Sequence, residues 1–226
     1  MTAPTIFLRA EDILRGREWP RQLERPRRTL AILLMMLLLF GSFYGALMGT
    51  YAGVMGDRIL QVIYSAAKVP LLLVVTFVVA LPSFFVLNTL LGVRGDFHVV
   101  LRALLTTQAG LTIILSSLAP LTLFWYASVE NYQAAILFNT LMFGVASISA
   151  QLLLLRFYRP LIAQRPIHRR LFQIWLILYA FVGVQMGWVL RPFIGDPSKP
   201  VQFFRDGAWG NAYVELVHIV TRLING

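Results

Sequence analysis

The side chains best suited to chemistry are three histidines, and their positions do not favour one shared site. His98 and His168 lie in short charged segments between apolar runs, and His218 lies near the end of the chain. Imidazole ligates metals and haem and exchanges protons near neutral pH, but a cofactor held within a bilayer needs a histidine inside an apolar run. The topology derived below also separates His218 from the other two, which excludes a zinc site built from all three.

Other residue types that carry catalysis are absent or isolated. The chain has no cysteine, so it has no thiolate nucleophile, thiolate metal site or disulfide. No carboxylate or lysine lies inside an apolar run, where proton-driven carriers usually hold one. No serine has a neighbouring base, and no phosphate-binding or dinucleotide fingerprint is present. We therefore predict no catalytic residue, no cofactor and no metal, and a protein that is not an enzyme.

The polar side chains inside the apolar runs are neutral. They are Asn88, Thr106, Gln108, Ser116, Ser117, Asn139, Gln151 and Gln185. Such groups commonly join helices by hydrogen bonds worth ~0.6 kcal/mol on average, and the alternative is that they line a path through the membrane.

Aromatic and basic residues gather after the last apolar run. They are Trp188, Arg191, Phe203, Phe204, Arg205 and Trp209. Aromatic rings beside arginines suit the headgroup level of a bilayer, and the same residue types are favoured at the centres of protein interfaces. We predict that this group contacts lipid or a partner.

The elements that must position these residues are membrane-spanning helices. Of the 226 residues, 58% are hydrophobic and only 13% are charged, whereas soluble domains have about 25% charged residues. A helix needs ~20 apolar residues to cross the hydrocarbon core, and five uncharged runs are that long. The predicted class is therefore an all-α polytopic membrane bundle of five spans. These spans cover about 29–48, 69–91, 103–126, 134–155 and 171–190.

Segments outside the spans are polar or amphipathic. Residues 1–28 form a basic arm, for which we consider a place on the headgroups or a loose conformation. Residues 57–68 set Asp57, Gln61, Ser65 and Lys68 at helical spacing and predict a short amphipathic helix at the interface. Residues 191–226 form a tail whose last part predicts a second amphipathic helix, with Asn211 as its cap.

The basic residues give the orientation. Fourteen lie on the side of the N-terminus and six on the other, so the positive-inside rule places the N-terminus in the cytoplasm and the C-terminus outside. Insertion and anionic lipid on the cytoplasmic side account for these arginines without nucleic acid. Arginine outnumbers lysine 18 to 2, a bias typical of a GC-rich bacterial source. We expect the bacterial cytoplasmic (inner) membrane.

Four glycines follow one another at four-residue spacing in the first run: Gly41, Gly45, Gly49 and Gly53. Gly183 and Gly187 repeat the spacing in the fifth run, and the fourth run has a patch of small residues around Gly144 and Ser147. Small residues let membrane helices approach closely. The ladder predicts helix packing, either inside one bundle or as a seam between copies.

The five-span layout and the segment KVPLLLVVTFVVALPSFFVLNTLLG (68–92) resemble the Yip-type family of membrane proteins. The segment is similar to the corresponding span of bacterial members, which are mostly uncharacterised, and the resemblance covers residues 29–190. The Asp-Leu-Tyr-Gly-Pro signature of eukaryotic members is absent. The resemblance thus implies a fold rather than a role in vesicle traffic.

Together these features favour a non-catalytic membrane protein that serves as a structural or accessory subunit of a larger membrane complex or of a homo-oligomer. Its partners would be membrane lipids and other membrane subunits or further copies of itself. The alternative is a channel or transporter subunit that conducts through an oligomer, with the neutral polar residues along the path.

Overall fold

The computed structural model describes residues 3–16, 26–205, 207–214 and 221, and no strand occurs among them. The first helix is α1 (Ala3–Leu14), followed by α3 (Pro26–Gly49), α4 (Arg58–Leu90) and α5 (Phe97–Ser117). Three more follow: α6 (Ala119–Ser128), α7 (Tyr132–Gln164) and α8 (Ile167–Leu190). Short 3-10 turns, η1 (Thr50–Ala52) and η2 (Arg94–Asp96), lie between them. The predicted all-α helical bundle is confirmed.

Five segments are long and apolar enough to cross a membrane: Arg28–Ala52, Arg58–Leu90, Arg94–Ser128, Tyr132–Gln164 and Ile167–Leu190. They correspond to the five predicted spans, so the chain is a multi-pass membrane protein. Four of them carry several exposed leucine, valine, isoleucine or phenylalanine side chains, and in Arg94–Ser128 such side chains are confined to α6. Exposed apolar faces of this kind suit contact with hydrocarbon.

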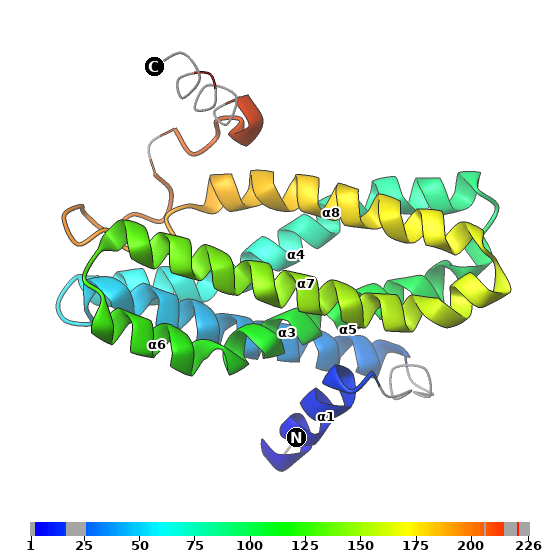
Figure 1. The fold of residues 1–226 in the computed structure, drawn as a ribbon, viewed down its shortest axis with the longest axis horizontal. Coiled ribbons are helices and arrows are strands. Elements are labelled where there is room, and N and C mark those ends of the chain that lie inside the picture. The colour runs from blue at the N-terminus through cyan, green and yellow to red at the C-terminus, as the bar shows by residue number, and fades with distance from the viewer. Residues whose placement is uncertain (1–2, 17–25, 206, 215–220, 222–226) are drawn as a thin grey trace.

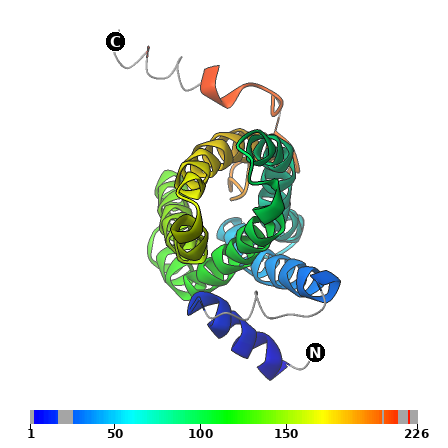
Figure 2. The ribbon, with the colours of Figure 1, turned by 90° about the vertical axis from the view of Figure 1, so that its right-hand side faces the viewer.

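The long helices form a ring, which Figure 2 shows end-on. Around it α8 adjoins α4, α4 adjoins α3, α3 adjoins α5, and α5 adjoins α7. Figure 1 shows α7 and α8 side by side, with α4 behind them. The most buried of the five segments is Arg94–Ser128, which contains α5: 67% of its most apolar stretch is buried, against 28% for the α7 span and 22% for α8.

The ring has two ends. The tail end comprises residues 50–57, 129–131 and 191–205, and the His168 end comprises residues 91–96 and 165–168. At the His168 end, Nε2 of His168 lies 3.1 Å from Oδ2 of Asp96, and His168 is only 1% exposed. This pair joins the start of α8 to η2, and Arg165 Nη1 lies 3.6 Å from the same carboxylate oxygen.

One predicted element was wrong. Residues 57–68 do not form a separate interfacial helix, because α4 runs through them without a break. Pro70 and Pro82 are both interior to α4. The third span is divided at Leu118, and Pro120 lies in the first turn of α6, where its missing N–H leaves no helical bond unmade.

The N-terminal arm contributes to the core. Ile13 of α1 is fully buried, and its Cγ2 would lie 3.5 Å from a Cβ added to Gly110 of α5. The apolar side chain of Ile13 thus packs the arm against the bundle.

Candidate functional site

The glycine ladder places α3 against α4 at backbone distance. A Cβ added to Gly45 would collide with the carbonyl oxygen of Ser65 and lie 3.0 Å from Cα of Ala66. A Cβ added to Gly49 would lie 2.6 Å from Cα of Val62. Because these two glycines press on backbone of the same chain, their contacts lie inside one bundle. Gly41 continues the row: a Cβ added there would lie 3.4 Å from Cβ of Pro70 and 3.4 Å from Cγ2 of Thr112 on α5.

The other glycines of the predicted packing set lie differently. Gly53 is outside α3, in a turn with φ of 99°, and a Cβ there would meet nothing within 4 Å. Gly183 has Thr76 Cγ2 at 3.6 Å, while Gly187 has open space. The ladder therefore has three rungs rather than four, and the pair on α8 does not form a matching close contact.

A cavity lies on the other side of α4. Its volume is about 1360 Å³, and its walls come from α4, α7, α8 and the segment after α8. Ordinary small-molecule pockets are ~300–1,000 Å³, so this one has room for a longer guest. The side chains along its length are mostly apolar, among them Leu73, Phe143, Ile148 and Val184.

Two neutral polar groups in the cavity wall have no hydrogen-bond partner. Oγ1 of Thr76 on α4 and Oε1 of Gln151 on α7 are both buried and unpaired. Other neutral polar side chains join helices: Tyr179 donates to Oε1 of Gln108 at 2.7 Å. Asn139 donates to the hydroxyl of Tyr126 at 2.7 Å. Since buried polar groups are usually satisfied, Thr76 and Gln151 mark the cavity as a place for a guest or water.

The tail end of the cavity is covered by residues 191–205, which we call the tail segment. A polar stripe on α4 holds it. Lys68 Nζ donates to the carbonyl of Pro192 at 2.7 Å, while Gln61 and Ser65 donate to the carbonyl of Phe193. All three α4 side chains are at most 1% exposed. This polar stripe of the predicted interfacial helix is therefore buried against backbone that the chain supplies after α8.

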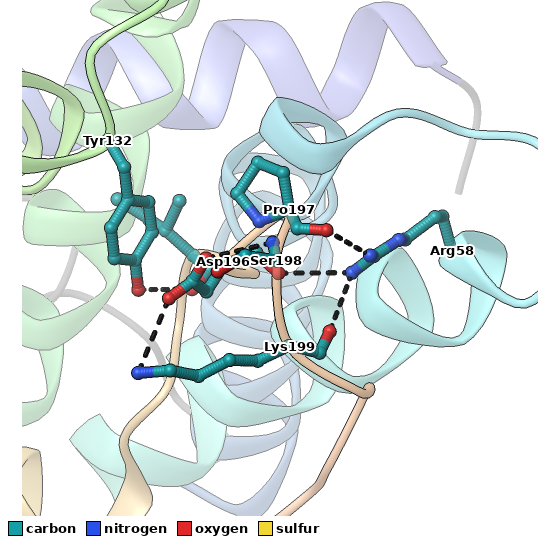
Figure 3. Close-up of polar contacts among 7 residues, drawn as sticks. Arg58, Tyr132, Asp196, Pro197, Ser198 and Lys199 are labelled. Atoms are coloured by element: carbon teal, nitrogen blue, oxygen red, sulfur yellow. Dashed lines mark hydrogen bonds and ion pairs between the residues drawn. The ribbon is translucent and has the colours of Figure 1, made fainter.

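A second set of contacts closes the tail segment onto α4 and α7 (Figure 3). Arg58 donates to the carbonyls of Asp196 at 3.1 Å and Lys199 at 3.0 Å, and also to that of Pro197. From the other side Tyr132 donates to the carbonyl of Ile194 at 3.3 Å. The hydroxyl of Ser198 donates to the Asp196 carboxylate at 2.6 Å. This bond is the largest cause that lowers the pKa of Asp196 below its ordinary value.

The structure places the six predicted contact residues in two groups. The guanidinium carbons of Arg191 and Arg205 lie 3.6 Å and 4.3 Å from the ring centroid of Trp188. Phe203, Phe204 and Trp209 form a chain of ring contacts, with centroids 4.8 Å and 5.8 Å apart. Arg191 and Arg205 also line the cavity, so one half of the cluster belongs to the cavity mouth.

The chain beyond the cluster returns to α8. Gln185 donates to the carbonyl of Gly210 at 3.1 Å and accepts from the amide of Ala212 at 2.9 Å. Asn211 accepts from the amide of Tyr213 at 2.9 Å, as expected of a cap. The predicted amphipathic tail helix begins at Ala212, and most of it lies outside the described residues, with His218.

Sequence reasoning found the α4 stripe, the tail cluster and the neutral polar residues, but not the cavity or the role of Arg58. For Lys68 the sequence indicated the stripe but not the burial: this residue bounds an apolar run, and the structure buries it fully. The position of a lysine directly before an apolar run was the signal in the sequence that could have indicated its burial.

No protein-family model matches the chain. Neither a curated protein nor a solved structure matches it.

Proposed function

We propose that this multi-pass membrane protein is a non-catalytic accessory protein that holds an amphipathic molecule of the bilayer in the cavity between α4, α7 and α8. The observation that carries the proposal is a cavity of about 1360 Å³ with apolar walls, placed between helices that can span a membrane. Hydrocarbon fills such a space without desolvation of charge, and the unpaired atoms of Thr76 and Gln151 give a polar guest group two places to bind.

A non-catalytic role is supported by what the polar side chains do. The neutral groups of the spans are engaged in structure: Gln108 binds Tyr179, Asn139 binds Tyr126, and Gln185 holds the tail backbone. The lysine of the α4 stripe holds the tail segment. These groups build the cavity and its cover, which is the work of a binding protein.

An accessory place in a larger assembly is supported by the outer part of the tail cluster. Trp209 is 81% exposed and Phe204 is 41% exposed, and aromatic residues are enriched where proteins meet. Purification in mild detergent with mass spectrometry tests this idea: a reproducible partner lost in Trp209→Ala supports it. Unchanged co-purification would reduce the cluster to a lipid anchor.

We place the protein in a bacterial cytoplasmic membrane, with the His168 end cytoplasmic and the tail end outside. The excess of arginine around the His168 end supports this orientation. Reporter fusions at Ile167 and after Gly226 should report opposite sides, and equal signals would contradict the orientation. We also propose that the chain has a Yip-type fold, which the five-span layout and the segment 68–92 support.

Native mass spectrometry at graded detergent stringency tests the cavity directly. Wild-type protein is expected to retain one long-chain guest per chain. Gly144→Phe and Gly187→Phe should lose it, because both glycines line the cavity and an added Cβ meets open space at each. Leu141→Phe is the matched control on α7, since Leu141 is 59% exposed and is not among the cavity-lining residues. A wild-type chain without a guest, or filled variants that keep it, would overturn the proposal.

A channel or transporter subunit is the second candidate. A smaller cavity of about 360 Å³ lies toward the His168 end and shares Leu155 and Phe172 with the large one. The open space thus continues along α7 and α8. Conductance of reconstituted protein that Gly144→Phe abolishes would favour this candidate over the binding role.

A further inference from the structure

The charges of the large cavity are confined to its tail end. The lining includes four basic side chains, Arg58, Arg191, Lys199 and Arg205, and Asp196 is the one acid among its described residues. The rest of the described lining is neutral. A guest that complements this arrangement is negative at one end and apolar over the rest of its length.

The four basic residues differ in the hydrogen bonds and ion pairs that their side chains make within the fold. Arg58 is held by backbone carbonyls of the tail segment. Lys199 Nζ lies 3.4 Å from Oδ2 of Asp196. Arg205 differs, because its Nε and Nη2 atoms are both buried and have no hydrogen-bond partner. Two buried guanidinium nitrogens without acceptors are costly, and an oxyanion is the acceptor that fits the forked geometry of arginine.

A second guanidinium strengthens the same position. Arg191 and Arg205 lie on one indole ring, that of Trp188, at 3.6 Å and 4.3 Å from its centroid. Two like charges on one ring repel each other, and an anion bound near both relieves the repulsion. Trp188 itself is carried by the last turn of α8, so this pair sits on a rigid helix end at the mouth of the cavity.

We propose that the guest is a lipid with a phosphate headgroup, bound by Arg205 and Arg191 at the tail end, with its acyl chains between α4, α7 and α8. The proposal rests on the proposed function and names the class of molecule that the cavity takes. Phosphate supplies several acceptor oxygens to the two unpaired donors of Arg205, and the apolar walls of the cavity contact the acyl chains. The orientation proposed above makes it a lipid of the outer leaflet.

The test is competition between phosphatidylglycerol and diacylglycerol, which lacks the phosphate, with identical acyl chains, presented to the full-length delipidated protein in detergent and read by native mass spectrometry. The wild type is expected to prefer phosphatidylglycerol by about tenfold, as a charge-assisted bond implies. Arg205→Gln should reduce the preference to near one. Arg170→Gln, an exposed charge at the His168 end, should leave the preference unchanged.

The outcomes separate the two proposals. If both lipids are retained equally by the wild type, the headgroup assignment is overturned while the cavity proposal stands. If neither lipid is retained, the cavity proposal itself fails. Displacement of phosphatidylglycerol by millimolar inorganic phosphate would show a site for free anions and would also overturn a lipid guest. The wild-type preference needs no variant, so misfolding of Arg205→Gln cannot hide the result.

Discussion

The two faces of α4 are packed in opposite ways. On one face Gly45 and Gly49 bring the backbone of α3 into contact with that of α4. On the other face α4 borders a cavity of about 1360 Å³, although small residues such as Gly144 and Gly187 also line it. Small side chains thus produce contact in one place and space in the other.

The difference lies in what small residues face. In lipid, helices associate through dispersion contacts that require close approach, and a glycine contributes only when backbone lies opposite. At Gly45 the opposite surface is the backbone at Ser65, whereas at Gly144 a Cβ would meet nothing within 4 Å. The α3–α4 seam is therefore a rigid support, and the α7–α8 side is where the fold leaves room for a guest.

The largest expected effect comes from Gly45→Leu. The side chain has no room against the carbonyl of Ser65, so α3 and α4 have to separate. Overpacking costs ~1–3 kcal/mol and occasionally more, and we expect at least ~3 kcal/mol here because backbone is displaced. Unfolding in detergent micelles measures the loss.

Gly144→Leu is the matched control on the cavity side. It should keep the wild-type free energy of unfolding within ~1 kcal/mol, because leucine favours a helix over glycine and the site is open. If both leucine variants unfold at the same denaturant concentration, the contrast between the two faces of α4 is wrong.

Lys68→Met tests the cover of the cavity. The change removes the donor to the Pro192 carbonyl and the cation 4.9 Å from the Phe203 ring centroid, but it keeps an apolar stem. A hydrogen bond to a charged group contributes ~1.5–3 kcal/mol, so the tail segment should exchange its amide hydrogens faster. Lys199→Met, at a side chain 75% exposed, should change exchange little. Equal protection in both variants would show that the α4 stripe does not hold the cover.

The sequence was sufficient for the bundle because each span is an uncharged run of adequate length, and hydrophobicity alone determines that. It was also sufficient to pick out Gln61, Ser65 and Lys68 as one stripe of a helix. The stripe was assigned to a helix at the membrane interface, because helical spacing shows which residues share a face and not what covers that face. The covering carbonyls of Pro192 and Phe193 lie far along the chain, so only the tertiary structure supplies them.

The cavity itself could not be predicted, because the sequence does not show where neighbouring helices fail to come into contact. Gly41 and Gly187 both belong to rows of glycines at four-residue spacing. A Cβ added to Gly41 would lie 3.4 Å from Pro70, whereas one added to Gly187 would meet nothing within 4 Å. In the tail the residue types indicated one contact: Arg191 and Arg205 lie on the ring of Trp188, an arrangement that cation–π attraction favours. Which tail residues line the cavity depended on the path of the tail segment.

Two glutamines offer a finer comparison of the packed and open sides. Gln108, 3% exposed, accepts the hydroxyl proton of Tyr179, so Gln108→Leu leaves a buried hydroxyl unpaired and should cost ~1 kcal/mol or more. Gln151 has an unpaired buried oxygen in the cavity wall, so Gln151→Leu should be neutral or slightly stabilising in guest-free protein. Thermal melting of both variants decides, and a larger loss for Gln151→Leu would mean that its amide is engaged.

The smallest effect concerns the pH dependence of the cover. The hydroxyl and amide of Ser198 bind the Asp196 carboxylate and lower its pKa. A depressed acid stabilises the fold above the pKa of the unfolded chain, and this contribution is lost as the pH falls through the folded value. The Ile194–Lys199 turn should therefore loosen only in acid, below the ordinary range of an aspartate. Ser198→Ala removes the leading cause, so the carboxyl carbon shift of Asp196 should titrate at higher pH in NMR spectra of the variant. An identical titration in both proteins would mean that another donor binds the Asp196 carboxylate. The conformation of the tail segment over the cavity would then not depend on the bond from Ser198.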